Sequence, residues 1–396
     1  MISTALSSTK ARMNPESNNR ESEPFVIDEN DRYSRLKLIG WWEQEKIANA
    51  KILVVGAGAL GNEVLKNLCL LGMGTIHIID FDEVQESNLT RSVLFRSRHE
   101  GQPKATVIAG MASELNPDCT LIPIQGNVLT DIGIGLIRDM DVVIGCLDNR
   151  EARLWVNRLC WKANTPWIDG GIQEINGVTK VFIPGDGPCY ECGMTENDYR
   201  LISLRYSCPL LRQEDIQQGK VPTAPTIASI IGGMQVQEAL KLIHGLPTDD
   251  GAAMVFNGAA NQFYKTKFTP REDCLSHETY DSIEESELTN LSSLAEVCES
   301  LQFENATMIL DRDFLVRLNC RTCDSHKQID RPLCLVGSSE GVCESCQQPL
   351  QPETISEVAL DSAFAKRSLS ELGIPDWDVI KIRTETEIHF VQLKKM

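Results

Sequence analysis

The strongest constraint on the fold is a glycine-rich turn between an apolar segment and a helical one. Residues 51–55 (KILVV) predict a buried strand, residues 56–61 form a G-x-G-x-x-G turn, and residues 62–71 carry leucine and valine at helical spacing. Small residues at such a turn let the backbone approach a phosphate group at a helix N-terminus. The turn therefore offers three candidate nucleotide-binding glycines: Gly56, Gly58 and Gly61.

Strand-like and helix-like segments alternate over the following hundred or so residues. Strands are predicted over 75–79, 119–124 and 141–145, and a helix over 104–115. Such alternation indicates a parallel sheet whose two faces are covered by helices. We therefore predict an α/β fold with a doubly wound, mostly parallel, Rossmann-like sheet.

Composition changes along the chain predict three parts. Residues 1–28 are rich in Ser, Asn and Glu, and we expect a disordered tail. Residues 29–278 form the nucleotide-binding domain, which includes a long irregular crossover loop at 195–222 before a helix over 226–244. Residues 279–396 form a small α+β domain that opens with an acidic helix over 281–300 and ends in strands within 379–393.

Charge and hydropathy exclude several kinds of partner. Lys and Arg total 38 and Asp and Glu total 56, which gives a net charge of −18. Phosphate-rich surfaces attract basic patches, so we expect no nucleic-acid partner. The sequence has no apolar run of the ~18 to 20 residues that a bilayer span needs, and its N-terminal segment lacks the apolar core of a signal peptide. We therefore expect a cytoplasmic protein without a membrane partner.

Charged residues gather after the ends of the predicted strands. Asp80 lies 24 residues after Gly56, where an acid can accept hydrogen bonds from a ribose, and Asp82 follows it. Arg91 and Lys104 supply two cations that can neutralise a triphosphate. Asp148, which follows the strand over 141–145, can hold the Mg²⁺ that bridges phosphate oxygens. Hydride transfer by a dehydrogenase needs no such set, so ATP is the expected ligand.

At these residues the chain resembles the adenylyltransferase superfamily of the ThiF, MoeB and HesA type. This superfamily includes the ubiquitin-activating enzymes and the bacterial enzymes that activate sulfur carriers. The resemblance covers residues 32–277 and implies that Asp80 binds the ATP ribose and that Asp148 serves magnesium and catalysis. It also implies that the phosphates are contacted by Asn88, Arg91 and Lys104. Ala59 and Ser92 depart from the common pattern, which puts affinity for ATP in question.

The resemblance also implies a homodimer. Residues 32–35 (RYSR) match an R-Y-x-R stretch whose second arginine, here Arg35, reaches the ATP of the partner subunit. Without the resemblance, Arg35 is an ordinary surface charge on a predicted helix.

The chain has 14 cysteines, several of them in C-x-x-C pairs, a pattern that favours metal or catalytic thiols in the cytosol. A C-x-x-C pair at 189–192 and a C-x-x-H pair at 274–277 can each present two ligands to tetrahedral zinc, although a C-x-x-C pair also fits a redox site. The resemblance implies structural zinc here, held by Cys189, Cys192, Cys274 and His277. Two further pairs, separated by 19 residues (324–342), have the spacing of a zinc ribbon. Their four ligands would be Cys320, Cys323, Cys343 and Cys346.

Cys208 lies in the predicted crossover loop without a C-x-x-C partner. Arg205 and Arg212 flank it, and neighbouring positive charge lowers the pKa of a thiol. The resemblance implies that a cysteine in this loop forms a thioester or persulfide with the carrier. A buried inert thiol is the alternative, because Pro209 and two leucines follow.

The sequence therefore predicts an enzyme that uses ATP to adenylate the C-terminal glycine of a ubiquitin-like protein. A thioester on Cys208 and transfer to a conjugating enzyme would follow. The alternative in the same superfamily is activation of a ubiquitin-like sulfur carrier as a thiocarboxylate for cofactor or thionucleoside synthesis. The competing hypotheses from other functional classes are a non-catalytic scaffold and a nicotinamide dehydrogenase.

Overall fold

The computed structural model describes residues 27–185, 187–207, 222–280 and 282–396. The chain forms two units, Met1–Trp42 and Glu43–Met396. The described part of the first unit contains one short 3-10 helix, η1 (Leu36–Leu38). The predicted tail over 1–28 lies almost wholly outside the described residues.

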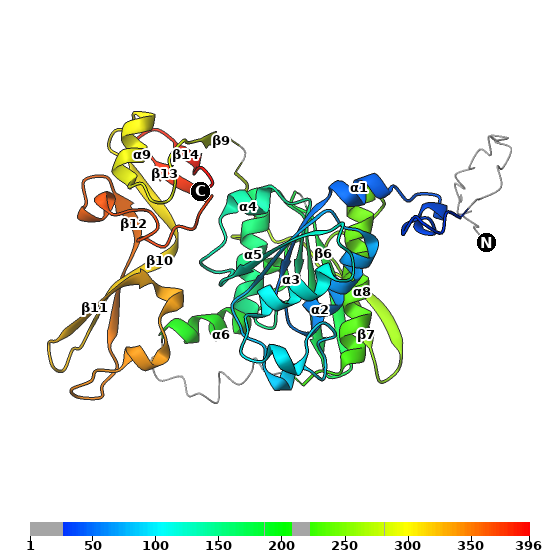
Figure 1. Ribbon diagram of the computed structural model, residues 1–396. Coiled ribbons are helices and arrows are strands. Elements are labelled where there is room, and N and C mark those ends of the chain that lie inside the picture. The colour runs from blue at the N-terminus through cyan, green and yellow to red at the C-terminus, as the bar shows by residue number, and fades with distance from the viewer. Residues whose placement is uncertain (1–26, 186, 208–221, 281) are drawn as a thin grey trace, which may run out of the picture. The chain divides into compact units, whose positions relative to one another are not determined.

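The second unit is built on an eight-stranded sheet in the order β3-β2-β1-β4-β5-β6-β7-β8 (Figure 1). The first five strands of this order are parallel, and the last three run antiparallel to their neighbours. The predicted α/β class with a mostly parallel, Rossmann-like sheet is thereby confirmed. The strands are β1 (Lys51–Val55), β2 (Thr75–Asp80), β3 (Thr120–Gln125), β4 (Val142–Gly145), β5 (Trp167–Gln173), β6 (Asn176–Phe182), β7 (Ala252–Asn257) and β8 (Gln262–Lys267).

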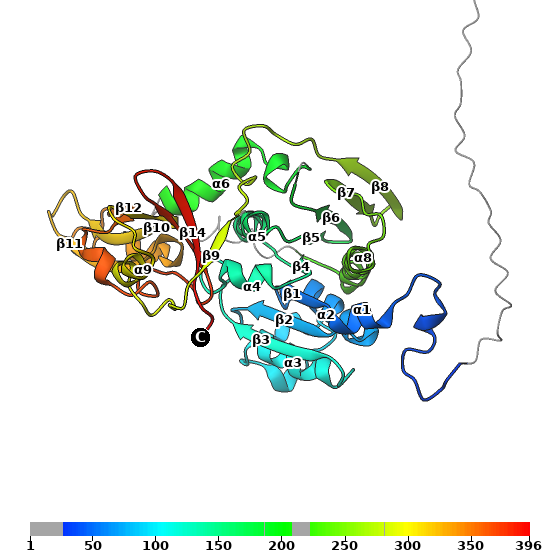
Figure 2. The same ribbon diagram turned by 90° about the horizontal axis from the view of Figure 1, so that it is seen from above.

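Helices cover both faces of this sheet (Figure 2). Helices α2, α3 and α8 lie on one face, and α4 and α5 lie on the other. The helices are α1 (Gln44–Asn49), α2 (Ala59–Leu71), α3 (Lys104–Ser113), α4 (Ile134–Arg138), α5 (Arg150–Ala163), α6 (Glu196–Ser207) and α8 (Pro225–His244). Three short 3-10 helices lie between them: η2 (Glu86–Asn88), η3 (Ser97–His99) and η4 (Glu191–Gly193).

A second sheet of six strands follows, in the order β11-β10-β13-β14-β9, with β12 also paired to β10. Strands β10 and β12 pair from Thr307↔Ala359 to Asn319↔Gln351, with shifts of register between. The remaining elements are β9 (Ile283–Glu285), α9 (Leu294–Leu301), β10 (Thr307–Asn319), β11 (His326–Pro332), η6 (Leu333–Leu335), η7 (Ser338–Gly341), β12 (Gln351–Ala359), η8 (Ala363–Lys366), β13 (Val379–Arg383) and β14 (Ile388–Gln392).

Two predictions about local structure are wrong. The segment 195–222, predicted as irregular, begins with helix α6 over residues 196–207. The acidic helix predicted over 281–300 is replaced by strand β9 and by helix α9, which begins only at Leu294. Ser293 starts α9 because its hydroxyl and the Glu296 carboxylate form a capping box. Strand β9 forms because it pairs with β14 in the second sheet.

The two sheets meet at a buried junction. The carboxylate of Asp378 accepts a hydrogen bond from the Ile134 backbone N–H at 2.8 Å, and the Arg312 guanidinium lies 4.2 Å above the centre of the Trp155 ring. Val379 of the second sheet also belongs to the core cluster built around β1 and α5. The core is therefore continuous across residue 278, and the domain boundary placed there stays a prediction.

Asp378 makes the junction sensitive to pH. Burial raises the pKa of this carboxyl to about 6, although Arg312 and two backbone N–H groups act in the opposite direction. Because the folded-state pKa is above the unfolded one, the stabilisation is complete below pH ~4 and is lost as the pH rises through ~6. We expect the free energy of unfolding of Asp378→Asn, relative to wild type, to rise by up to about 3 kcal/mol between pH 4 and pH 7. Urea titrations at both pH values measure this difference, and an equal difference at the two values would contradict it.

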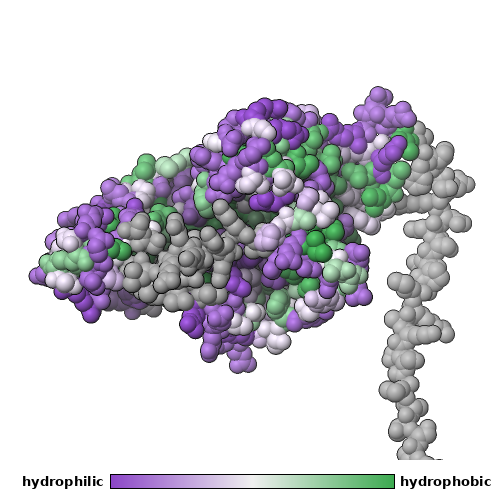
Figure 3. All heavy atoms as spheres, turned by 90° about the horizontal axis from the view of Figure 1, so that it is seen from below, coloured by the Kyte–Doolittle hydropathy of each residue, from purple (hydrophilic) through white to green (hydrophobic). Residues whose placement is uncertain are grey.

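One face of the molecule shows how hydrophilic and hydrophobic residues are distributed on it (Figure 3). Purple hydrophilic residues predominate on the face shown in Figure 3, with hydrophobic residues in small patches between them. The exposed large hydrophobic side chains come from several elements and include Leu70, Phe81, Phe263, Tyr264 and Leu275. Among the described helices, none combines the length and hydropathy needed to cross a membrane.

Candidate functional site

The glycine turn lies at the carboxyl ends of the central strands of the large sheet. Val55 of β1 is paired with Ile79 of β2 and with Gly145 of β4. The backbone N–H of Gly56 donates to the Ile79 carbonyl at 2.9 Å, and that of Cys146 donates to the Val55 carbonyl at 2.8 Å. The carboxyl ends of three parallel strands therefore meet at this edge, where open α/β sheets bind their ligands.

The three glycines of the turn have different surroundings. Gly56 has φ +101°, and a Cβ there would lie 2.4 Å from the Cys146 carbonyl oxygen. A Cβ at Gly61 would lie 2.1 Å from the Gly56 carbonyl oxygen, whereas one at Gly58 would meet nothing within 4 Å. Packing within the protein therefore requires Gly56 and Gly61 but leaves space beside Gly58, just before the N-terminus of α2. Binding of a nucleotide at this space stays a prediction.

Substitution of Gly58 should weaken ATP binding, whereas substitution of Gly56 should destabilise the fold. We expect Gly58→Ala to change the free energy of unfolding by less than about 1 kcal/mol, because the added methyl group meets no protein atom. The same methyl group should raise the Kd for ATP roughly tenfold or more by obstructing a phosphate group. Gly56→Ala should instead destabilise the fold by about 3 kcal/mol. Thermal unfolding and calorimetric titration with ATP measure both effects, and unchanged ATP affinity in Gly58→Ala would count against a phosphate site.

Two acidic residues at the end of β2, Asp80 within the strand and Asp82 just after it, hold the glycine turn and the ammonium of Lys104. The Asp80 carboxylate accepts hydrogen bonds from the backbone N–H groups of Ala57 at 2.7 Å and Asp82 at 2.8 Å, and burial raises its pKa. The Asp82 carboxylate pairs with the Lys104 ammonium at 2.7 Å, and Lys104 is only 9% exposed. The structure thus brings Asp80, Asp82 and Lys104 together beside the glycine turn.

The other residues predicted to contact ATP make local contacts. Asn88 accepts a hydrogen bond from the Gln85 N–H at 3.1 Å, and Arg91 donates to the Ser87 carbonyl at 2.8 Å. Asp148 is exposed and accepts a hydrogen bond from the Asn149 amide at 3.2 Å. No contact joins Asn88, Arg91 or Asp148 to Asp80 or Lys104 among the described residues, so their shared role stays a prediction.

Sequence reasoning missed a buried charge network behind Asp148. Arg153 of α5 donates to the Leu147 carbonyl at 2.5 Å and pairs with the Asp169 carboxylate at 2.9 Å. Lys180 pairs with the other oxygen of Asp169, which is 1% exposed. The network fixes the backbone just before Asp148. The signal for this network in the sequence was Asp169, an acidic residue inside the apolar segment WIDGG.

Two predicted residues are not placed at this site. Arg35 precedes η1 in the unit Met1–Trp42, and its role toward a partner subunit stays a prediction. Cys208 lies outside the described residues, so its role as nucleophile also stays a prediction.

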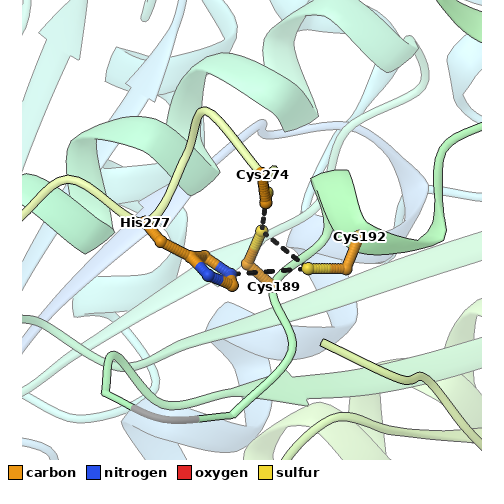
Figure 4. Close-up of side chains that lie close together, drawn as sticks. All are labelled: Cys189, Cys192, Cys274 and His277. Atoms are coloured by element: carbon orange, nitrogen blue, oxygen red, sulfur yellow. Dashed lines mark hydrogen bonds between the residues drawn. The ribbon is translucent and has the colours of Figure 1, made fainter. Parts of the chain in front are cut away.

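The first predicted metal cluster is assembled as expected. Figure 4 shows its four side chains converging from two chain segments. The Cys189 sulfur lies 3.8 Å from that of Cys192 and 3.4 Å from that of Cys274, and the Cys192 sulfur lies 3.4 Å from Nε2 of His277. Such separations match ligands placed ~2.0 to 2.3 Å from one tetrahedral ion.

The surroundings of this cluster favour metal binding by His277. Its ring stacks on Trp161 with centroids 5.2 Å apart, which fixes the orientation of the imidazole. Burial lowers the pKa of His277, so the ring stays neutral and can act as a ligand. The histidine that replaces a fourth cysteine therefore completes the set of donors.

The second cluster joins the turn after β10 to the segment before β12. The ligand atoms of its four cysteines, Cys320, Cys323, Cys343 and Cys346, all lie within 4.8 Å of one another. Cys320 and Cys343 are buried, whereas Cys323 is exposed. Backbone hydrogen bonds from residues 345 and 346 lower the pKa of Cys343 to about 6, which favours the thiolate that binds metals. The structure thus brings the four predicted ligands together, and their binding of zinc stays a prediction.

The parallel sheet, the glycine turn and the acids at the strand ends define a Rossmann-like α/β protein with a site at its strand edge. The chain belongs to the ThiF family, whose model matches residues 30–276. This membership confirms the resemblance to the adenylyltransferase superfamily.

Several curated proteins are similar to parts of this chain. The SUMO-activating enzyme subunit uba-2 of Caenorhabditis elegans is 39% identical over 154 residues, which are 38% of this chain and 26% of that protein. The adenylyltransferase and sulfurtransferase MOCS3-1 of Drosophila pseudoobscura pseudoobscura is 31% identical over 252 residues, 62% of this chain and 53% of that protein. The chain thus spans between a quarter and about half of the length of these relatives.

Solved structures support the same fold. The crystal structure of E. coli MccB with ATP superposes with a TM-score of 0.52 and 23% identity, over 67% of this chain and 77% of that one. The complex of E. coli MccB with MccA-N7isoASN gives a TM-score of 0.52 and 24% identity, over 63% and 75% of the two chains.

Proposed function

We propose that this protein adenylates the C-terminal glycine of a ubiquitin-like protein with ATP. The observation that carries the proposal is the space beside Gly58 at the carboxyl ends of the strands of a ThiF-family sheet. Asp80 binds the N–H of the neighbouring Ala57, and Asp82, two residues after Asp80, pairs with Lys104. The relatives named as SUMO-activating enzyme subunit and as adenylyltransferase and sulfurtransferase support it.

In the proposed reaction the carrier carboxylate attacks the α-phosphorus of ATP, and pyrophosphate leaves. The N-terminus of α2 and the ammonium of Lys104 would stabilise negative charge on the phosphates, together with Asn88 and Arg91. Lys104 would then exchange its Asp82 partner for phosphate oxygens. No side-chain nucleophile is required at this step, since the carrier itself supplies the attacking oxygen.

Asp148 is the proposed magnesium ligand. Its carboxylate is exposed at the end of β4, and the Arg153 network holds the backbone before it. Oxygen donors of this kind suit Mg²⁺, which supplies charge neutralisation at the phosphates. Asp80 would bind the ribose, because two backbone N–H groups hold its carboxylate beside the glycine turn.

Both cysteine clusters are proposed zinc sites. Their thiolate and imidazole donors are those that zinc prefers, and each set converges on one point. All positions of a tetrahedral ion would be filled by protein, so both sites would be structural. A homodimer, with Arg35 reaching the ATP of the partner subunit, and a cytoplasmic location complete the proposal.

The two candidate functions differ in what happens to the adenylate. We favour capture as a thioester on Cys208 and transfer to a conjugating enzyme. Sulfur-carrier activation is the second candidate, supported by the similarity to MOCS3-1 over 62% of this chain. The product distinguishes them, because a carrier thiocarboxylate supports the second and transfer to a conjugating-enzyme cysteine supports the first.

Pyrophosphate–ATP exchange tests the proposed activation. Purified protein is incubated with ATP, magnesium, labelled pyrophosphate and one of several ubiquitin-like proteins that end in Gly-Gly. We expect label to enter ATP only when a suitable carrier is present, and loss of exchange when its last glycine is deleted. No exchange with any carrier would overturn the proposal. For the thioester, a reducible adduct should vanish in Cys208→Ala while exchange persists.

A further inference from the structure

A buried carboxylate links the two halves of the first metal cluster. Glu191 lies between Cys189 and Cys192 in one ligand loop and is fully buried. Its carboxylate accepts a hydrogen bond from Ser276, which lies between Cys274 and His277 in the other loop. An ion that fixes both loops would therefore also fix the position of Glu191.

The same carboxylate holds two helices. Arg158 of α5 donates to Glu191 at 2.9 Å, and the Tyr199 hydroxyl of α6 donates to the same oxygen at 2.8 Å. Glu191 thus has hydrogen-bond donors from the metal loop, from α5 and from α6. Since this carboxylate is shielded from water, each of these contacts is stronger than a surface pair would be.

Helix α6 makes a second charged contact, toward the predicted ATP site. Asp198 pairs with the Arg150 guanidinium at 2.9 Å, and its other oxygen accepts hydrogen bonds from Thr195 at the start of the helix. Arg150 is the first residue of α5, and only Asn149 separates it from Asp148. Asp198 and Tyr199 are adjacent, so one turn of α6 contacts both Glu191 of the metal loop and Arg150, two residues after Asp148.

We propose that Glu191 and Asp198 are positioning residues that make α6 a link between the first metal cluster and the Asp148 loop. Metal binding orders the two ligand loops and, through Glu191 and Tyr199, holds α6. Helix α6 in turn holds Arg150 through Asp198. The role toward Asp148 rests on the proposed function, whereas the coupling of α6 to the metal does not.

Hydrogen exchange of the full-length protein tests the coupling without any need for catalysis. We expect removal of zinc by a chelator to speed amide exchange in residues 196–207 about tenfold, the size expected for loss of a hydrogen bond to a charged group. In Tyr199→Phe, which removes only one hydroxyl, exchange should already be faster with zinc bound, and the chelator should add little. Equal protection of α6 with and without zinc, or unchanged exchange in Tyr199→Phe, would overturn the inference.

Three variants test the contact between Asp198 and Arg150. Asp198→Asn should speed exchange in α6, and Asp198→Glu should restore protection because it keeps the charge that pairs with Arg150. Glu196→Gln is the control, since it removes the same charge from an exposed position in the same turn. If Glu196→Gln had the same effect as Asp198→Asn, the specific pair would be refuted.

The kinetics of pyrophosphate exchange provide the last test. In pyrophosphate exchange, Asp198→Asn should raise the KM for ATP several-fold with kcat nearly unchanged, because a displaced loop weakens nucleotide binding. An unchanged KM would refute the link to Asp148. Absence of exchange in the wild type would refute the proposed function instead, while the amide exchange rates would still decide the coupling of α6 to the metal.

Discussion

Asp148→Ala is expected to reduce pyrophosphate–ATP exchange by about a hundredfold to a thousandfold, the range found when one preorganised electrostatic group is removed from an active site. The side chain is exposed and makes one hydrogen bond, with Asn149. Its removal should therefore change the free energy of unfolding by less than about 0.5 kcal/mol. A large catalytic loss without a loss of stability would identify Asp148 as a catalytic group.

The assay measures exchange at saturating carrier over a range of magnesium concentrations. Because Asp148 is proposed to hold magnesium, Asp148→Asn should need more magnesium to reach its half-maximal rate. Asp361→Ala is the matched control, since Asp361 is an exposed acid in the second sheet region, outside the proposed site. Exchange at the wild-type rate in Asp148→Ala would remove this residue from the mechanism.

Loss of metal from the second cluster should unfold the ribbon while leaving the large sheet intact. Among the described residues, the buried core beside the second cluster consists of Leu315, Leu318 and Leu350 with the two ligands Cys320 and Cys343, and a few partly buried hydrophobic residues pack against it. Structural zinc contributes roughly 10 kcal/mol or more to the folding of such small domains. Without the ion, little apolar burial would remain to hold the ligand-bearing segments 320–325 and 341–350, whereas β11 between them also pairs with β10.

Cys323→Ser tests this dependence without disturbing packing, because Cys323 is the exposed member of the cluster. We expect zinc content to fall from two ions per chain to one, and amides of residues 320–325 and 341–350 to exchange on the order of a thousandfold faster. Cys334→Ser is the control, since it changes the same atom at a cysteine outside the cluster. Two retained ions in Cys323→Ser, or an equal effect in Cys334→Ser, would contradict a four-cysteine zinc site.

The sequence was sufficient for those features that depend on local pattern. The apolar segment 51–55 and the glycine turn predicted β1 and the loop at the sheet edge, and the C-x-x-C spacing predicted two ligand sets. Even His277 could be named as a candidate ligand, because its distance from Cys274 along the chain is that of a ligand pair. Short-range geometry determines such features, so one sequence reveals them.

Features that depend on distant contacts could not be predicted. Helix α6 was missed because its sequence, ENDYRLISLRYS, has no clear apolar stripe; Asp198 and Tyr199 tie it to residues elsewhere in the chain. Strand β9 was missed because its acidic residues favour a helix locally, whereas pairing with β14 decides the outcome. Asp169 was overlooked for the same reason, since only the fold brings Arg153 and Lys180 to it.

The pairing of β10 with β12 places the two ends of the ribbon segment side by side. Asn319 and Gln351 lie directly opposite each other on these strands, and the ribbon occupies the intervening sequence 320–350. A short turn could join the two residues and close an ordinary hairpin, because paired antiparallel strands need as few as about two connecting residues. The same intervening sequence contains β11, which pairs with β10, so an engineer who exchanged the ribbon for another binding module would have to keep or replace this strand of the second sheet.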